Sequence, residues 1–459
     1  MSEALVLSPD TLLVLCERRC ARDLWVDATG VRTWLELGSA VRAAQAACQA
    51  AGVQPGEIVL TPGEASFAAL AWFFGAALAG AVVAPLRAER EGELENWNLQ
   101  AAPHWRVRGQ ALERAQGGAA SPAAERLLAP LRAAGRPGLI LATGGTTGVP
   151  KLVLHDLVAL LATVAVKQSV ARRIMPLMRF DHIGGLDMVW RALGSGHVLV
   201  APPAELTPAS VAAAIERHGV EVMPATPSFL NLMLAAEVHR SRSLSSLRVV
   251  PYGAEPMPVG LLARLGAALP KVEFVQRFGT SETGALPVSD SGAGLLLGDD
   301  VAGFEWKIVA DELWVRSPAR ALGYLSGAPG GFGADGWFRT GDLAERLPDG
   351  AVRVLGRCEE LINVGGEKVL PAEVEAVLQE HPQVADCRVY AERNALLGQV
   401  VAVEIVWRGP ETDVLVVKRS LHEFAAGRLP RHKLPANVRL VSAVGTTRNL
   451  KKSRSVSPA

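Results

Sequence analysis

The sequence has no excess of charge of either sign and little cysteine. Its 459 residues contain 47 Lys and Arg against 46 Asp and Glu, a net charge of +1. A chain this close to neutral has no overall electrostatic attraction to nucleic acid or anionic lipid. The five cysteines are too few and too scattered for a disulfide framework. Cys16 and Cys20 lie four residues apart, but no second Cys or His pair accompanies them at the spacing of a metal site. We therefore expect reduced thiols, as in a cytoplasmic protein.

The sequence also lacks a recognisable targeting segment. Met1 to Ala4 carries an acid where a signal peptide carries a base, and no small-residue cleavage site follows an apolar core. The stretch 67–86 has no charge for 20 residues and is long enough to span a membrane. Gly80 divides it, so we interpret it as a buried helix from Phe67 to Ala79 and a buried strand from Ala81 to Pro85. The sequence thus predicts a cytoplasmic protein with no membrane span.

Helix and strand patterns alternate along most of the chain. Hydrophobic residues make up 49% and charged residues 20%, which excludes a disordered chain. The length suggests two or three domains. The expected strands are Glu57–Thr61, Leu139–Ala142, Val198–Ala201, Val220–Met223, Leu247–Val250 and Val272–Val275, with helices such as Ser39–Ala51 and Pro208–Arg217 between them. This alternation predicts an α/β fold with mixed, largely parallel sheets and flanking helices.

The pattern changes after about Gly356, where shorter strands accompany one clear helix, Pro371–Gln379. We place a domain boundary there. The prediction is a large N-terminal domain, residues 1–357, and a small, mobile C-terminal α+β domain, residues 358–459.

A loop rich in small and hydroxyl residues follows the strand at Leu139–Ala142 and ends at Lys151. Glycines let backbone amides close around an anion, threonines add hydroxyl donors, and the lysine adds a charge suited to a polyphosphate. It is not a Walker A loop, because Pro150 precedes the lysine and Leu152 follows it. A flexible linker is the alternative, but a linker has no need of paired threonines between glycines. The predicted phosphate-binding residues are Thr143, Gly144, Gly145, Thr146, Thr147, Gly148 and Lys151.

This loop resembles the phosphate loop of the adenylate-forming superfamily, which includes acyl- and aryl-CoA synthetases, peptide-synthetase adenylation domains and luciferases. The family form is Thr-Ser-Gly-Thr-Thr-Gly-x-Pro-Lys-Gly. Here Gly144 replaces the serine and Leu152 the last glycine. Further segments of the chain resemble the family in the same order, and together they cover nearly the whole sequence.

Two of these segments resemble the family's adenine side. Phe278 to Glu282 is similar to Tyr-Gly-x-Thr-Glu, whose aromatic packs on adenine and whose glutamate helps to hold Mg²⁺; a carboxylate suits a hard cation. Tyr252 to Pro256 resembles the preceding segment. The resemblance assigns nucleotide contacts to Ala254, Glu255, Pro256, Phe278, Gly279, Thr280 and Ser281, catalysis and Mg²⁺ binding to Glu282, and the border of the acyl pocket to Gly253.

Later segments resemble the ribose site, the hinge and the thiol side. By this resemblance Asp342 binds the ribose hydroxyls, Arg357 lies near the ribose and phosphate, and Glu359 marks the hinge. Taken singly, each is better explained without a site, Asp342 as a turn residue, Glu282 as a helix cap and Arg357 as a surface charge. The assignment rests on their joint occurrence in the family's order. The residues implied on the thiol side are Gly365, Gly366 and Lys368, and the glycines permit a close backbone approach.

The C-terminal tail is similar to the family's Gly-Lys-x-x-Arg ending, whose lysine is catalytic in adenylation. Counting back from Arg454 gives Lys451, with Leu450 in place of the glycine, and Lys452 competes for the role. A basic nucleic-acid patch is the alternative, but no base-stacking aromatic is interleaved with the charges, so we expect no nucleic-acid partner.

The acyl pocket is marked by Asp181-His182. The segment around them resembles Phe-His-x-x-Gly-Leu of aryl- and acyl-CoA ligases such as o-succinylbenzoyl-CoA synthetase. The chain also resembles benzoate- and coumarate-type ligases. A buried core histidine is the alternative for His182. If Asp181 faces the pocket, it can pair with a substrate amine, as in amino-acid adenylation domains.

The resemblance implies an acid–thiol ligase. It would use ATP and Mg²⁺ to convert a small aryl or short acyl acid into an acyl adenylate, and would then transfer the acyl group to coenzyme A. The alternatives are an enzyme that loads an amino or aryl acid onto the phosphopantetheine of a carrier protein in trans, and a nucleotide-binding protein that has lost catalysis. We expect a monomer or homodimer.

Overall fold

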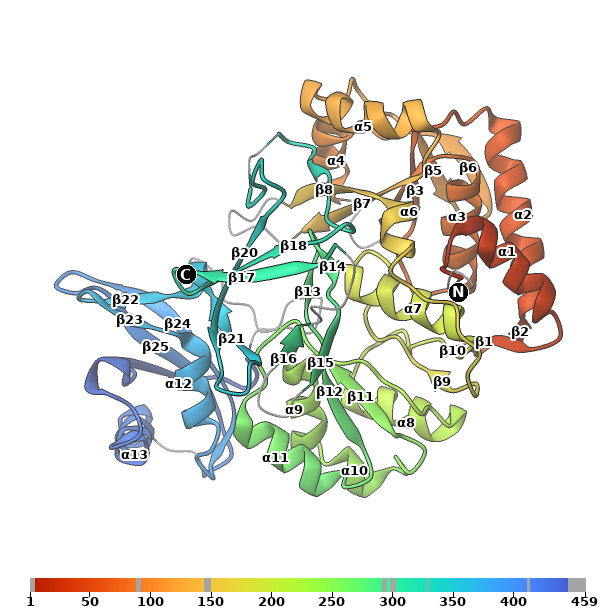
Figure 1. The fold of residues 1–459 in the computed structure, drawn as a ribbon. Coiled ribbons are helices and arrows are strands. Elements are labelled where there is room, and N and C mark those ends of the chain that lie inside the picture. The colour runs from red at the N-terminus through yellow and green to blue at the C-terminus, as the bar shows by residue number, and fades with distance from the viewer. Residues whose placement is uncertain are drawn as a thin grey trace.

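The computed structural model describes residues 5–87, 92–143, 150–290, 295–297, 303–327, 330–410 and 413–444. Within these residues, helices flank two sheets in the N-terminal part, an antiparallel sheet follows, and a separate C-terminal unit lies at one side (Figure 1). The predicted α/β class, with a large N-terminal part and a smaller C-terminal part, is confirmed.

The first sheet is buried on both faces. In spatial order its strands are β19 (Gly323–Tyr324), β8 (Lys151–Asp156), β7 (Gly138–Thr143), β4 (Val82–Leu86), β3 (Ile58–Pro62), β5 (Trp105–Arg108) and β6 (Ala111–Arg114). The pairs β3–β4, β3–β5 and β4–β7 are parallel, whereas β6, β8 and β19 add antiparallel pairs. In β3, Ile58 and Leu60 join one core cluster and Val59 joins the other. Burial on both faces explains why the central strands β3 and β4 are largely apolar runs.

Helices cover both faces of this sheet. One core cluster receives side chains from α1 (Pro9–Arg18), α2 (Trp34–Ala51), α3 (Phe67–Leu78) and α6 (Leu157–Leu161). The cluster on the other face receives them from α4 (Leu94–Gln100) and α5 (Pro122–Ala134).

The uncharged stretch 67–86 forms a helix and a strand, as predicted. Ser66 caps α3 by accepting a hydrogen bond from the backbone N–H of Ala69. The chain then turns at Gly80, whose φ of +79° favours glycine, and enters β4. No helix among the described residues is long and apolar enough to cross a membrane.

The second sheet comprises β2 (Gly30–Thr33), β1 (Asp23–Asp27), β10 (Val198–Val200), β9 (Arg173–Ile174), β11 (Val249–Tyr252) and β12 (Glu273–Gln276). The strand predicted at Val220–Met223 is wrong, since only Val222 pairs there, as an isolated bridge between Ile174 and Val249. The neighbouring helices are α7 (Ile183–Ser195), α8 (Pro208–His218), α9 (Pro227–Ala235), α10 (Val238–Ser241) and α11 (Val259–Ala268).

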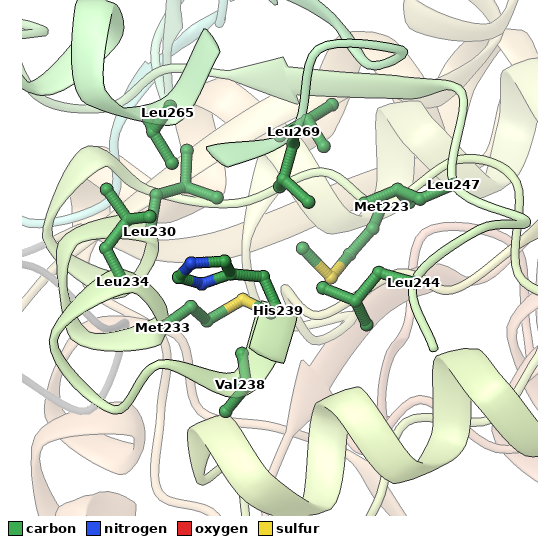
Figure 2. Close-up of a pocket in the computed structure, with 11 residues that line it drawn as sticks. Met223, Leu230, Met233, Leu234, Val238, His239, Leu244, Leu247, Leu265 and Leu269 are labelled. Carbon is green, nitrogen blue, oxygen red and sulfur yellow. The ribbon is translucent and has the colours of Figure 1, made fainter. Parts of the chain in front are cut away.

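A small apolar cavity lies in the core beside this sheet. Figure 2 shows leucine, methionine and valine side chains around the ring of His239. The cavity measures about 10 Å³, which is room for roughly one water molecule. None of its lining residues belongs to the predicted site, so this cavity belongs to the core packing.

An antiparallel sheet connects the α/β part to the C-terminal unit. Its strands are β15 (Val288–Asp290), β16 (Leu295–Leu297), β21 (Val352–Arg357), β20 (Phe338–Arg346), β18 (Glu312–Arg316) and β17 (Glu305–Val309). A short hairpin of β13 (Gly279–Thr280) and β14 (Gly284–Ala285) precedes it. The alternating pattern did not predict this sheet.

The C-terminal unit has its own sheet and core. Its strands are β23 (Glu367–Val369), β22 (Ile362–Val364), β25 (Gly398–Trp407), β24 (Val384–Asn394) and β26 (Asn437–Leu440), with helices α12 (Pro371–Leu378) and α13 (Val414–Ala425) and single turns η2 (Cys358–Glu360) and η3 (Arg431–Lys433). Its described core cluster begins at Ile362, and the domain boundary placed after Arg357 stays a prediction. Helix α13 was not predicted.

Candidate active site

The predicted phosphate loop joins two paired strands. Thr143 ends β7 and lies opposite Lys151, which begins β8. The side-chain amides of Asn96 and Gln100 each donate a hydrogen bond of 2.9 Å to the carbonyl oxygen of Pro150, and Gln100 also accepts one from the N–H of Leu152. Helix α4 therefore fixes the backbone on both sides of Lys151. Five predicted loop residues lie outside the described residues: Gly144, Gly145, Thr146, Thr147 and Gly148.

Tyr324 connects Lys151 with Glu282. The Nζ atom of Lys151 lies 5.5 Å from the centroid of the Tyr324 ring. The hydroxyl of that tyrosine donates a 2.7 Å hydrogen bond to Oε1 of Glu282. Burial and the neighbouring Glu282 carboxylate raise the pKa of Tyr324, so the phenol remains a protonated donor. A cation and a carboxylate from segments far apart in sequence are thus held against one aromatic ring.

Buried polar contacts fix the hairpin that carries Glu282. The hydroxyls of Thr280 and Thr283 lie 3.1 Å apart inside the turn. Nε2 of the fully buried His155 lies 2.6 Å from the carbonyl oxygen of Ser281. Because a carbonyl only accepts, Nε2 carries the proton, and burial lowers the pKa of His155 and keeps the ring neutral. The backbone next to Glu282 is therefore tied to the same strand that begins at Lys151.

Asp342 and Arg357 lie opposite each other on β20 and β21 and form an ion pair. The Nε–Oδ1 distance is 3.0 Å, and Arg357 also donates a 2.8 Å hydrogen bond from Nη1 to the carbonyl oxygen of Thr340. Burial alone would lower the pKa of Arg357, but the carboxylates of Asp342 and Glu282 raise it. The negative charge of Glu282 thus acts on Arg357, one of the residues predicted on the ribose side.

The predicted adenine-side segment follows β11 in a constrained turn. A Cβ atom on Gly253 would lie 2.4 Å from the carbonyl oxygen of Arg277, so only glycine fits without a backbone shift. Ala254 has a φ of +70°, which alanine rarely adopts. The carboxylate of Glu255 accepts a hydrogen bond from the N–H of Ser228 at the start of α9, where the helix dipole favours a negative charge.

Asp181 is buried in an ion pair with Arg87. The Nε–Oδ2 distance is 2.7 Å, and each side chain is 4% exposed. The prediction that Asp181 receives a substrate amine gains no support, because a cation from this chain already occupies one face of the carboxylate. His182 caps α7, and its Nδ1 accepts a 3.1 Å hydrogen bond from the N–H of Gly184.

Two family models match this sequence. The model described as AMP-binding enzyme covers residues 102–325, and the AMP-binding enzyme C-terminal domain covers residues 373–451. The chain belongs to the AMP-binding enzyme family.

The relatives of this AMP-binding enzyme include several ligases. It is 32% identical to the indoleacetate–CoA ligase of Aromatoleum aromaticum (strain DSM 19018 / LMG 30748 / EbN1), over 66% of this chain and 63% of that protein. It is also 32% identical to pyochelin synthase PchD of Pseudomonas aeruginosa, over 66% of this chain and 60% of that protein. The chain therefore spans somewhat less than two thirds of these curated relatives.

A solved structure shares the fold over nearly all of the chain. The anthranilate CoA ligase AuaEII, in complex with anthranoyl-AMP, superposes with a TM-score of 0.79 at 20% sequence identity. The comparison covers 98% of this chain and 97% of that one. At this identity it establishes the architecture of the AMP-binding enzyme and leaves its substrate open.

The described residues suit Mg²⁺ held jointly by the protein and a phosphate chain. No group of three or more His, Cys, Asp or Glu that could hold a metal occurs among them. Mg²⁺ commonly takes one or two carboxylates and completes its shell with substrate phosphates and water. Glu282, with one oxygen oriented by Tyr324, fits that role.

The predicted thiol side lies on the C-terminal unit. Gly365 and Gly366 form the turn between β22 and β23 with φ values of +60° and +100°, and Lys368 is exposed on β23. Glu359 lies in η2 and contributes to the field at Arg357. No hydrogen bond or ion pair within the described ranges joins Gly365, Gly366 or Lys368 to Glu282. Lys451 and its competitor Lys452 lie outside the described residues.

Sequence reasoning missed the supporting residues Tyr324, His155 and Arg87. Each acts through a partner distant in sequence, separated by 42 residues for Tyr324 and Glu282, 126 for His155 and Ser281, and 94 for Arg87 and Asp181. No local pattern marks such pairs. For His155 the available signal was a histidine that directly follows three apolar residues of β8.

Proposed function

We propose that this enzyme activates a small carboxylic acid with ATP and transfers the acyl group to the thiol of coenzyme A. In the first step the acid's carboxylate attacks the α-phosphorus of ATP, the bond to the β-phosphate oxygen breaks, and pyrophosphate leaves. In the second step the thiol, after losing its proton, attacks the acyl carbon and AMP leaves. The enzyme is thus an AMP-forming acid–thiol ligase, and we expect it in the cytoplasm.

The convergence of charged groups around Glu282 is the observation that carries this proposal. Lys151 and Glu282 both contact Tyr324, and the field of Glu282 reaches the Asp342–Arg357 pair. A triphosphate needs cationic and hydroxyl donors, and a ribose diol needs a carboxylate acceptor. This cluster contains both kinds of group, which supports the proposal.

The chain's residues position the reactants and offset charge, since phosphoryl-type transfer needs little covalent help from the protein. In our proposal, Lys151 and the loop that begins at Thr143 hold the triphosphate, while Asp342 binds the ribose. Mg²⁺ on Glu282, when bound, would neutralise charge on the phosphates. Lys451 would offset the charge that develops between the attacking carboxylate and the α-phosphate.

The thiol step would use the C-terminal domain. We propose that this domain turns at Glu359, withdraws Lys451 and brings the face formed by Gly365, Gly366 and Lys368 to the adenylate. Separating the two steps in this way protects the reactive mixed anhydride from water.

We infer that the acid is an aryl or short acyl acid without an α-amine. The Arg87–Asp181 pair leaves the pocket without a free carboxylate at the position where amino-acid adenylation domains bind an ammonium group. The names of the indoleacetate and anthranilate ligases add support for an aromatic acid.

Carboxylate-dependent exchange of pyrophosphate into ATP tests the first step. We would run it with aryl, short acyl, fatty and amino acids. Exchange with an aryl or short acyl acid supports the proposal, and exchange with amino acids alone contradicts the substrate class. ATP binding without exchange for any acid would point to a nucleotide-binding protein that has lost catalysis.

Loading of a carrier protein in trans is the second candidate, and the similarity to pyochelin synthase PchD is what favours it. The two candidates differ only in the thiol acceptor. With the acid found by exchange, AMP release should be stimulated by coenzyme A if the leading proposal holds, and by a phosphopantetheinylated carrier protein alone if the alternative holds.

A further inference from the structure

Two amide side chains of α4 hold the backbone on either side of Lys151. The side-chain N–H groups of Asn96 and Gln100 each donate a 2.9 Å hydrogen bond to the carbonyl oxygen of Pro150. Oε1 of Gln100 also accepts a 3.1 Å hydrogen bond from the N–H of Leu152. The amide of Gln100 therefore bonds the backbone groups immediately before and after the lysine.

Gln100 acts at this edge of β8 as the backbone of a neighbouring strand would. The pairing of β19 with β8 is followed by a 2.9 Å hydrogen bond from the N–H of Leu325 to the carbonyl oxygen of Leu152. The next backbone groups along the same edge, toward Lys151, are bonded by the Gln100 amide. On the opposite edge Lys151 pairs with Thr143 of β7. Because partly buried backbone groups need partners, Gln100 completes the pairing that holds Lys151 in place.

Core packing fixes the helix that carries both amides. Asn96 and Gln100 are four residues apart and therefore lie on one face of α4. Trp97 of the same helix is fully buried in a core cluster that also contains Leu152. Nε2 of Gln100 donates a 2.6 Å hydrogen bond to Oδ1 of Asn96, so each amide orients the other. The helix and the start of β8 thus share one core, which limits how far the amides can move relative to that strand.

A fixed backbone matters at Lys151 because the lysine side chain is long and flexible. Its four-carbon stem lets the ammonium group reach many positions once the backbone moves. In the structure the Nζ atom lies 5.5 Å from the centroid of the Tyr324 ring, and the hydroxyl of that ring donates to Glu282. Holding the backbone keeps this positive charge near the carboxylate expected to bind Mg²⁺. It also reduces the conformational entropy that is lost when the ammonium group binds a phosphate chain.

We propose that Gln100, supported by Asn96, positions Lys151 for the β- and γ-phosphates and thereby sets the preference of this enzyme for ATP over AMP. The inference rests on the proposed function, in which Lys151 holds the triphosphate. AMP lacks those two phosphates, so its binding depends little on where the ammonium group lies. Loss of the Gln100 amide therefore weakens ATP binding and leaves AMP binding nearly unchanged. General damage to the fold would instead weaken the binding of both nucleotides.

Calorimetric titration of the full chain with ATP and with AMP, both in the presence of Mg²⁺, tests the proposal. In Gln100→Leu the dissociation constant for ATP should rise about tenfold and that for AMP less than about twofold. Asn96→Ala should show the same selectivity with a smaller effect, because Gln100 still bonds Pro150, and it decides the question if Gln100→Leu does not fold. The matched control is Gln49→Leu, which changes an exposed glutamine of α2 and should bind both nucleotides as the wild type does.

Combining the substitution with Lys151→Ala shows whether Gln100 acts through the lysine. Adding Gln100→Leu to Lys151→Ala should change ATP affinity little, because the charge that the amide positions is already gone. Equal losses in the two backgrounds, equal weakening of ATP and AMP binding, or wild-type ATP affinity in Gln100→Leu would overturn the proposal. Pyrophosphate exchange by the wild-type protein keeps the two claims apart. Selectivity for ATP that depends on Gln100, without exchange for any acid, would contradict the proposed ligase activity and support the positioning role.

Discussion

The buried pair Arg87–Asp181 gives the sharpest prediction for a single substitution. Two unit charges 2.7 Å apart attract each other by about 6 kcal/mol at an effective dielectric constant of roughly 20. Both side chains are 4% exposed, so removing one of them strands the other charge away from water. Asp181→Asn should therefore destabilise the protein by about 3–5 kcal/mol.

Replacing both charges at once separates the effect of a stranded charge from general damage. Replacing both partners, as in Arg87→Met with Asp181→Leu, removes both buried charges and should recover most of the lost stability. The matched control is Asp187→Asn on α7, whose partner Arg191 is 45% exposed and whose loss should cost only about 0.3–0.5 kcal/mol.

Urea unfolding followed by tryptophan fluorescence measures these differences, with exchange assays on the same proteins. Near-wild-type stability of Asp181→Asn would refute the reasoning. If that variant also lost pyrophosphate exchange with an amino acid, Asp181 would bind a substrate amine and the substrate class proposed above would be wrong.

Three further predictions concern residues of the candidate active site. Tyr324→Phe keeps the ring beside Lys151 but removes the 2.7 Å bond to Glu282, so kcat/KM for ATP should fall about tenfold with an unchanged melting temperature; unchanged kinetics would count against an orienting role. Gly253→Ala puts a Cβ atom 2.4 Å from the Arg277 carbonyl oxygen. It should lower the free energy of unfolding by about 1–3 kcal/mol in an unfolding titration and raise the KM for ATP. If neither value changed, the turn would accommodate the methyl group without strain. Burial lowers the pKa of His155, so as the pH falls below about 6.5 this residue is protonated in the unfolded chain but stays neutral in the folded chain. The free energy of unfolding is therefore retained above that pH and decreases as the pH falls below it. His155→Gln should make the unfolding midpoint less dependent on pH below about 6.5, and an unchanged slope would remove His155 as the cause.

Local patterns predicted the elements that are apolar and bounded by glycine. The helix and strand within 67–86 are examples, because Gly80 divides an apolar run that is buried over residues 69–77 and 81–86. Val220–Met223 was wrongly predicted to be a strand. A short, largely apolar run also occurs where a single residue, here Val222, bridges two neighbouring strands. The antiparallel strand β20 escaped notice because its buried positions include the polar residues Thr340 and Asp342, so burial alternates along the strand while hydrophobicity does not.

The candidate site could be predicted from the sequence only in part, because local patterns do not show which distant residues the fold brings together. Lys151, Glu282, Asp342 and Arg357 occur in segments that resemble a known family. Their supports, Tyr324, His155 and Arg87, are defined by partners that the fold brings together from far along the chain. Likewise, nothing in the sequence around Asp181 indicates that it forms an ion pair with Arg87.

Pyrophosphate exchange in a pair of glutamate variants tests the central claim most directly. Glu282→Gln keeps the shape of the side chain but removes the carboxylate from the cluster. Its control, Glu345→Gln, removes an exposed carboxylate that pairs with Arg353 on the surface of the antiparallel sheet. With the acid that wild-type protein accepts, we predict that Glu282→Gln loses about a hundredfold or more of the exchange rate, as loss of a preorganised charge contact does, while Glu345→Gln retains it. Wild-type exchange in Glu282→Gln would contradict the assignment of this cluster as the ATP site.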